Sequence, residues 1–144
     1  MTNTIAIAHL FACFAMTGVI WLIQLVQYPM FAYIDPAKFA AAHAMHSNNI
    51  TLIVFPLMGL ELVTSFYLAG AGDAPGNRVW MGLNLLGVLA LWGSTAILYV
   101  PLHNILTIGG YNLEVIERLV TLNWIRTLVW SLRSGVWVIW LLIK

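Results

Sequence analysis

The sequence predicts an all-α integral membrane protein: a four-helix bundle with both ends of the chain on one side of the bilayer. Composition is the first observation behind this prediction. Of 144 residues, 62% are hydrophobic and 8% are charged, which is more apolar surface than a soluble domain of this size can bury. The second observation is a set of four apolar runs, each near the length of about 20 residues that crosses a membrane. The chain therefore forms a single transmembrane domain, residues 1–144.

Turn-forming residues divide the chain into these four spans. Pro29 follows the first span, a loop rich in Gly and Pro over residues 70–76 follows the second, and the third ends near Pro101. We expect the spans at roughly residues 5–28, 49–68, 79–100 and 119–143.

A further helix is expected before the second span. Asp35 followed by Pro36 is typical of a helix N-cap with proline in the first turn, and it predicts an interfacial helix over residues 36–48. Glu61 follows His43 by 18 residues, about five turns of 3.6 residues. If this helix runs without a break into the second span, these two side chains lie on one stripe of it.

Orientation rests on the basic residues near the span ends. Arg78 and Lys144 lie on the side of the termini, and Lys38 and Arg118 lie on the opposite side, so the two sides tie. The N-terminal amine favours a cytoplasmic side for the termini. We therefore expect a multi-pass protein of the cell membrane, typical of a bacterial inner membrane. Its expected partners are membrane lipid, a hydrophobic small molecule, and either further copies of itself or a larger membrane complex. The net charge of +1 indicates no nucleic-acid partner.

Polar side chains gather near the membrane side opposite the termini. A polar or ionisable group inside a membrane is costly and usually faces a bundle interior or a cavity, where it often has a task. His9 lies toward the other side, which argues against a site of four histidines. All four spans contribute to the gathering, and its members are Gln24, Gln27, His43, His46, Asn49, His103, Asn104, Asn123 and Arg126.

The histidines of this region allow two interpretations. His43 and His46 are three residues apart and share a helix face, and His103 lies at a similar depth. Three converging imidazoles could hold copper, iron or zinc, with haem less favoured. The alternative is that histidines at a membrane interface only snorkel or cap a helix.

Asn123 and Arg126 also share one helix face. An arginine this deep needs an acceptor, which could be a carboxylate, a backbone carbonyl, the Asn104 side chain or an anionic ligand. The functional interpretation is that Asn123 and Arg126 orient a substrate oxygen and stabilise its negative charge. The structural alternative is a hydrogen-bonded clasp between spans three and four.

A second set of polar residues lies near the middle of the membrane. Glu61 and Arg133 are each about a dozen residues into their helices and can meet there as a buried ion pair. The functional alternative is that Glu61 is a proton-carrying carboxylate. Gly82, Gly87 and Gly93 are interpreted as sites of close helix packing.

Three further residues are predicted to contact a substrate. Trp124 stands between Asn123 and Arg126 and could form the wall of an aromatic pocket, although simple packing is the alternative. Gln27 and Tyr99 lie at the same membrane depth.

The third and fourth spans carry a short motif. The stretch Val100-Pro101-x-x-Asn104-x-Leu106, then Leu119-Val120, then Asn123-Trp124 and Arg126, resembles the DUF1772 group of small four-helix membrane proteins, which includes the fungal anthrone oxygenases. The resemblance implies an oxygenase-like protein that acts on a lipophilic, aromatic or phenolic molecule.

The match assigns roles to residues and has two departures. Asn104, Asn123 and Arg126 fit the pattern of the group. Trp124 follows the asparagine, whereas the fungal pattern has the tryptophan before it. His103 stands between Pro101 and Asn104 and could add a metal ligand that the anthrone enzymes lack.

Three hypotheses therefore stand. The first is an oxygenase-like protein with a polar pocket near the outer membrane face and with Arg126, Asn123, Asn104 and His103 as catalytic residues. The second is a non-catalytic protein that binds a metal or haem through His43, His46 and His103. The third is a membrane scaffold or assembly partner whose polar residues only hold helices together.

Overall fold

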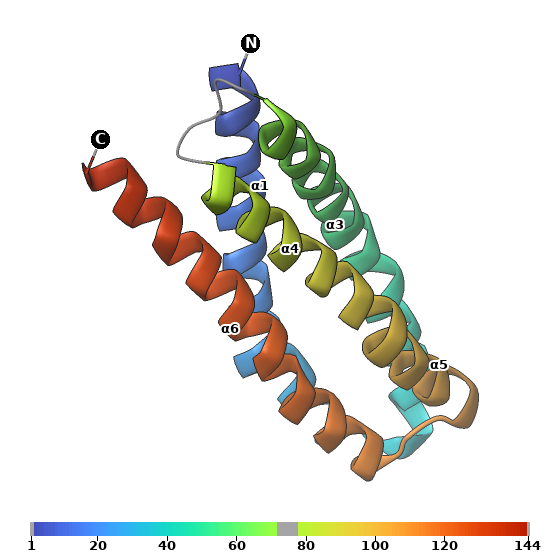
Figure 1. Cartoon of the computed structure of the whole chain (residues 1–144). Coiled ribbons are helices and arrows are strands. Elements are labelled where there is room, and N and C mark those ends of the chain that lie inside the picture. The colour runs from blue at the N-terminus through green and yellow to red at the C-terminus, as the bar shows by residue number, and fades with distance from the viewer. Residues whose placement is uncertain (1, 72–77, 144) are drawn as a thin grey trace.

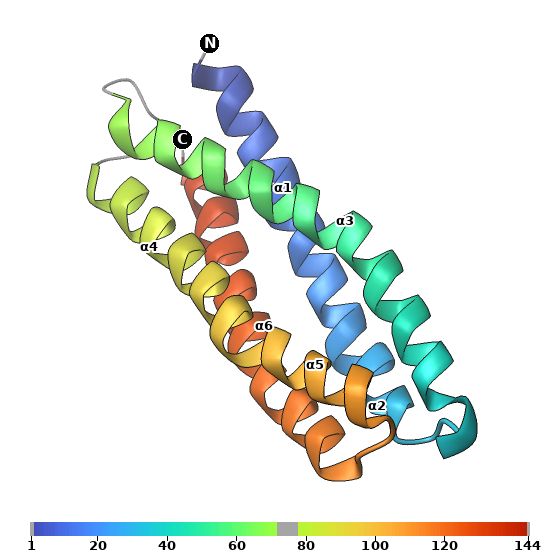
Figure 2. The same cartoon turned by 90° about the vertical axis from the view of Figure 1, so that its right-hand side faces the viewer.

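The computed structural model describes residues 2–71 and 78–143 and shows an all-α bundle (Figure 1). The first and last described residues lie at the same end of the bundle, as predicted (Figures 1 and 2). The predicted loop after the second span falls largely on residues 72–77, which lie outside the described residues, as does Lys144. The elements in the described part are α1 (Thr2–Leu22), η1 (Ile23–Gln27), α2 (Tyr28–Phe31), α3 (Pro36–Gly70), α4 (Arg78–Ser94), η2 (Thr95–Tyr99), α5 (Val100–Gly109) and α6 (Leu113–Ile143).

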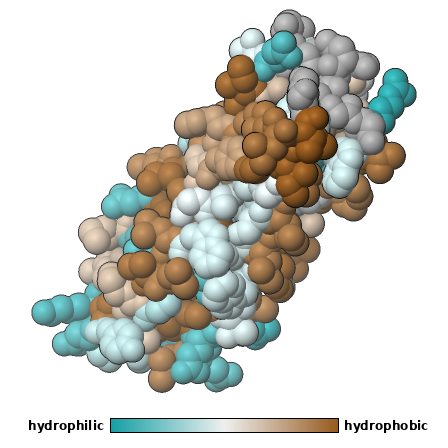
Figure 3. Space-filling model, turned by 90° about the vertical axis from the view of Figure 1, so that its left-hand side faces the viewer, coloured by the Kyte–Doolittle hydropathy of each residue, from teal (hydrophilic) through white to brown (hydrophobic). Residues whose placement is uncertain are grey.

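These elements join into long helices that fit a multi-pass membrane protein. Within the described residues, four helices are long and apolar enough to cross a membrane: Asn3–Phe31, Pro36–Gly70, Arg78–Gly109 and Leu113–Ile143. Many large apolar side chains point outward, including Leu52, Val63 and Leu142. Figure 3 shows apolar residues over much of one face, with hydrophilic residues mostly toward the two ends. Lipid is the solvent that suits such a surface.

Pro29 and Pro101 do not end the first and third spans, so this part of the prediction was wrong. A π-helical turn precedes each proline, η1 in one case and η2 in the other, and the helix then continues to Phe31 and to Gly109. Each proline lies in the first turn of the following α-helix, where a missing N–H costs little. The helix thus passes each proline with a π turn and does not break there.

The helix that begins at Pro36 continues into the second span, as the sequence allowed. Asp35 caps it, with a carboxylate oxygen that accepts the N–H of Ala37 at 2.8 Å, and α3 then runs through 35 residues without a break. His43 and Glu61 both face the interior, as expected for one stripe of a continuous helix. The fourth helix also begins earlier than predicted, at Leu113.

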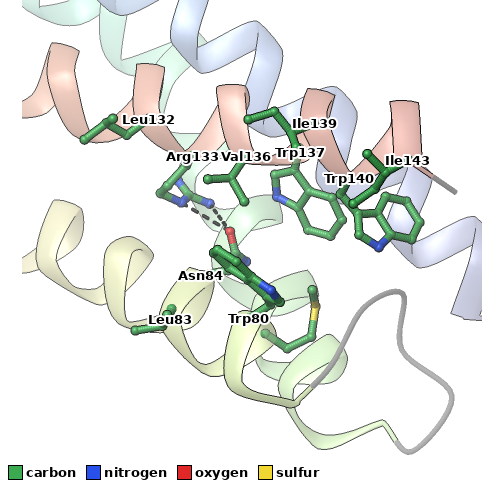
Figure 4. A pocket seen from close by; sticks show the side chains of 11 residues that line it. Trp80, Leu83, Asn84, Leu132, Arg133, Val136, Trp137, Ile139, Trp140 and Ile143 are labelled. Carbon is green, nitrogen blue, oxygen red and sulfur yellow. Dashed lines mark hydrogen bonds between the residues drawn. The ribbon is translucent and has the colours of Figure 1, made fainter.

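The predicted ion pair forms in the interior of the bundle. Arg133 Nη1 lies 2.7 Å from Glu61 Oε1, and both side chains are almost fully buried. Arg133 also donates to Asn84 Oδ1 from Nε and Nη2, at 3.3 and 3.1 Å, and Trp130 Nε1 donates to Glu61 Oε2 at 3.0 Å. Figure 4 shows Arg133 on α6 reaching across to Asn84 on α4, within a groove between the two helices. These contacts neutralise and solvate both charges within the protein.

The surroundings of this pair test two further predictions. A Cβ on Gly87 would lie 2.9 Å from Arg133 Cδ, so this glycine does allow close packing, whereas Gly82 and Gly93 face open space and do not. His9 bonds Thr64 and Asn84 at 2.9 and 3.1 Å. It therefore belongs to the network of the ion pair and lies apart from the other histidines.

Candidate functional site

A cavity of about 210 Å³ lies between α3 and the η2–α5 segment, in the half of the bundle away from the termini. Its walls are mainly apolar and include Val54, Met58 and Trp92. Phe55 and Val100, both well exposed, form part of its lining, so the cavity opens on the apolar outer surface of the bundle. A mostly apolar pocket with a few converging polar groups is the usual form of a small-molecule site. The polar groups are those of Tyr28, His46, His103, Arg126, Tyr99, Thr51 and Thr95.

Arg126 is the charged group of this cavity. Its Nε and Nη2 donate to Asn123 Oδ1 at 3.0 and 2.6 Å, and Nη2 also donates to the Tyr28 hydroxyl at 3.1 Å. The guanidinium carbon lies 3.7 Å from the centre of the Tyr99 ring, a cation–π contact. Within residues 2–71 and 78–143, Arg126 has no carboxylate partner, and its Nη1 has no hydrogen-bond acceptor. The charge is therefore held in place but is not neutralised.

Asn123 fixes the direction of this guanidinium. It is fully buried and donates its Nδ2 to Gln24 Oε1 at 2.9 Å, which leaves Oδ1 turned toward Arg126. Gln24 is anchored in turn by donation to the Val120 carbonyl at 3.1 Å. The sequence predicted a hydrogen-bonded clasp between the third and fourth spans. Instead, the partners Gln24 and Tyr28 join the fourth span to the first, and Arg126 contacts the third span through the Tyr99 ring.

The three predicted histidines come together at one end of the cavity. His103 Nε2 lies 2.9 Å from the Tyr28 hydroxyl, and His103 Nδ1 lies 3.0 Å from His43 Nε2. The rings of His46 and His103 are nearly parallel, with centroids 6.0 Å apart. Both nitrogens of His103 are thus engaged in hydrogen bonds.

This arrangement does not fit a metal ion. In the part of the chain that the structure describes, no group of three or more His, Cys, Asp or Glu side chains could hold one. Metal ligation needs ring nitrogens directed at a common point, and two of the three imidazoles are directed at each other. A metal at His43, His46 and His103 stays a prediction without support from this geometry.

The two π-helical turns position the tyrosines of the site. Tyr28 directly follows η1, and Tyr99 is the last residue of η2. Both rings are almost fully buried, and the Tyr99 hydroxyl donates to the Leu122 carbonyl at 2.8 Å. Single π turns within α-helices often occur at functional sites. The sequence marks them only indirectly, by a proline one or two residues after each tyrosine.

Some predicted site residues lie elsewhere. Asn104 is exposed on α5, since it is one step, about 100°, around the helix from His103. Trp124 is 40% exposed and packs edge-on against Trp21, outside the cavity. Gln27 is half-buried and does not line the cavity.

Two residues of the site were not predicted as functional. The sequence did not single out Tyr28, and it indicated only the membrane depth of Gln24. They are four residues apart and share one helix face, a spacing that could have singled them out. Of the predicted set, the structure brings together Arg126, Asn123, His103, Tyr99, His43 and His46.

Comparison of the chain with protein-family models, with curated proteins and with solved structures gives no match.

Proposed function

We propose that this chain binds a lipophilic aromatic molecule with an acidic oxygen, such as a phenol or an enol, and promotes its oxidation as an oxygenase-like membrane protein. The main observation behind this proposal concerns Arg126. Its guanidinium is buried at the wall of the cavity and has no carboxylate partner among the described residues. An ionised side chain in a membrane-spanning bundle is costly and usually has a partner. The oxyanion of a bound ligand would supply that partner.

The size and lining of the cavity favour an aromatic ligand. An apolar protein cavity of about 150 Å³ accepts benzene, so a cavity of about 210 Å³ has room for one substituted ring. Met58 and Trp92 offer apolar contact to the ring, and Arg126 receives its oxygen at the polar end. A lipophilic molecule can arrive from the bilayer past Phe55.

The side chains also suit proton removal. Tyr28 and His103 are hydrogen-bonded at 2.9 Å and both line the cavity, so His103 can act as the base through the tyrosine hydroxyl. His46 adds a second imidazole to the lining. Arg126, held by Asn123, stabilises the oxyanion that remains. The resulting electron-rich anion is the form that dioxygen, the co-substrate of an oxygenase, oxidises.

The resemblance to the DUF1772 group supports the same class of substrate. Asn123 and Arg126 of its motif meet at the cavity, whereas Asn104 does not. We further propose a multi-pass location in a cell membrane, such as a bacterial inner membrane. The termini would be cytoplasmic, the cavity would lie near the outer face, and self-association or a larger membrane complex remains part of the proposal.

A chromophoric phenol tests the proposal directly. A lipophilic nitrophenol, added to the protein in nanodiscs at a pH below the aqueous pKa of the probe, reports its own ionisation through its visible absorbance. We expect the wild-type protein to bind it and to shift it to the phenolate. Arg126→Met should abolish the shift, and Arg126→Lys should restore it in part, since lysine keeps the charge without the planar fork.

Arg118→Met is the matched control. It removes the same charge from an exposed position on the same helix, so it should leave the shift unchanged. A folded Arg126→Met protein that still ionises the probe would overturn the proposal. If the wild-type protein gives no shift, and Arg126→Met changes only stability, the polar residues are clasps of a scaffold. Metal that is retained by the wild type and lost with His43 and His46 would instead favour the metal-binding alternative.

A further inference from the structure

A continuous chain of hydrogen bonds leads from the cavity to the end of the bundle. Arg126 Nη2 donates to the Tyr28 hydroxyl at 3.1 Å, and this hydroxyl lies 2.9 Å from His103 Nε2. His103 Nδ1 lies 3.0 Å from His43 Nε2, and His43 Nδ1 lies 3.4 Å from Thr107 Oγ1, the longest link. Thr107 is exposed in the last turn of α5 and donates to the His103 carbonyl at 2.9 Å. This chain of hydrogen bonds therefore begins at the cavity and ends at the surface of the protein.

The donor and acceptor roles along these hydrogen bonds are consistent with one direction. Arg126 can only donate, so the Tyr28 oxygen accepts from it and is free to donate its own hydrogen to His103 Nε2. His103 then carries a hydrogen on Nδ1 and donates to His43 Nε2. His43 in turn carries a hydrogen on Nδ1 and donates toward Thr107. Every donor from Arg126 to His43 then points from the cavity toward Thr107, whose own hydroxyl donates to the His103 carbonyl.

Aromatic rings enclose the middle of the chain. His43 is fully buried, and the ring of Phe39 stacks on it with centroids 5.6 Å apart. Phe31 packs edge-on against His43 at 5.5 Å, and Tyr111 packs edge-on against Phe39 at 5.4 Å. These rings occupy the space where water would otherwise lie. His43 is thus shielded from the surface, and the hydrogen-bonded path from His103 to Thr107 passes through its imidazole.

We propose that Tyr28, His103 and His43 form a proton relay that carries the proton of the bound ligand from the cavity to the exposed end of α5. The inference rests on the proposed function, which supplies that proton. In the transfer, the ligand O–H bond breaks and a new O–H forms on Tyr28, whose own hydrogen moves to His103 Nε2. The hydrogen on His103 Nδ1 moves to His43 Nε2, and the hydrogen on His43 Nδ1 leaves at Thr107 to water.

His43 distinguishes the relay from the binding site, because it does not line the cavity. In the nitrophenol experiment, stopped-flow absorbance follows the phenolate, and a water-soluble pH indicator follows the proton released to the buffer. With His43→Gln, which keeps a hydrogen-bonding side chain but cannot pass a proton, we expect the same phenolate fraction at equilibrium. Proton release should be slower by roughly 10²-fold, the lower end of what a positioned proton-transfer group contributes.

His9→Gln is the matched control, since His9 is also a buried histidine but belongs to the ion-pair network. It should release protons at the wild-type rate. Wild-type release from the folded His43→Gln protein would overturn the relay and leave the binding proposal intact. Absence of phenolate in the wild type would instead remove the proposed function itself.

A measurement on the wild-type protein keeps the test independent of any variant that fails to fold. The rate of proton release is measured in mixtures of light and heavy water. A plot of this rate against the deuterium fraction should be curved, because several hydrogens move together. A linear dependence, which indicates a single moving hydrogen, would contradict the relay.

Discussion

Arg126 and Arg133 lie seven residues apart on one face of α6, and both are buried, yet their surroundings differ. Arg133 has a carboxylate at 2.7 Å and a second partner in Asn84. Arg126 has an amide, a hydroxyl and an aromatic ring, and no carboxylate partner in the part of the chain that the structure describes. The first arrangement is electrically complete and serves stability. The second lacks a counter-ion among the described residues, and in the proposed function the oxyanion of a ligand supplies it.

The cavities beside the two arginines differ in the same way. A groove of about 250 Å³ next to Arg133 is lined almost wholly by apolar side chains, among them Trp80, Trp137 and Trp140 (Figure 4). Its arginine is already neutralised by Glu61. The slightly smaller cavity beside Arg126 also presents two imidazoles. Size alone would therefore select the groove beside Arg133, whereas the arginine without a carboxylate partner among the described residues selects the cavity beside Arg126.

The largest expected effect is on stability and comes from Arg133. Replacement by methionine leaves Glu61 buried without its counter-ion, which typically costs about 3–5 kcal/mol. We expect Arg133→Met to unfold far earlier than the wild type in an SDS titration followed by circular dichroism. The double variant Arg133→Met with Glu61→Gln should recover much of the loss, because it removes the stranded charge. A single variant as stable as the wild type would mean that the pair is not formed.

The next effect separates two asparagines that the sequence alone treats alike. Asn123→Ala leaves Arg126 Nε without its acceptor and removes the 2.9 Å donor of Gln24 Oε1, and an unsatisfied buried group costs about 1–3 kcal/mol. Asn104→Ala removes an exposed side chain and should change the stability and the phenolate shift of the probe very little. Loss of the phenolate shift in the Asn104 variant would show that the motif of the DUF1772 group acts here through Asn104 as well.

This difference shows how far the sequence predicts the site. Apolar length and the depth of polar residues are enough to predict four helices, the Glu61–Arg133 pair and the gathering of histidines. They do not predict which side of a helix faces inward after a π turn. A π turn accommodates one extra residue and so rotates everything beyond it by about 100°. Depth and the family resemblance, which selected Gln27 and Asn104, therefore do not decide which side chains face the cavity, and neither of these two residues lines it.

A smaller effect is expected at Gly87, where the close approach of Arg133 leaves no room for a side chain. A Cβ would lie 2.9 Å from Arg133 Cδ, and the ion pair limits how far that side chain can shift. Overpacking of this kind costs about 1–3 kcal/mol, so we expect Gly87→Ala near the lower end. Gly93→Ala on the same helix faces open space and should be stabilising by about 0.5–1 kcal/mol. SDS titrations of the two variants beside the wild type would show these opposite changes in the free energy of unfolding.

Among the two buried arginines, the smaller effect on stability is expected for Arg126, whose charge has no counter-ion among the described residues. Arg126→Met leaves Asn123 Oδ1 and the Tyr28 hydroxyl without a donor, but it also removes a buried charge that no described carboxylate neutralises. These contributions oppose each other, so we expect a net change within about 1 kcal/mol. The same variant should lose the phenolate shift of the probe. If Arg126→Met were instead as destabilising as Arg133→Met, Arg126 would be a structural clasp, and the contrast between the two arginines would disappear. A small loss of stability in Arg126→Met would mean that this buried charge contributes little to folding, and in the proposed function the bound ligand then compensates for its burial.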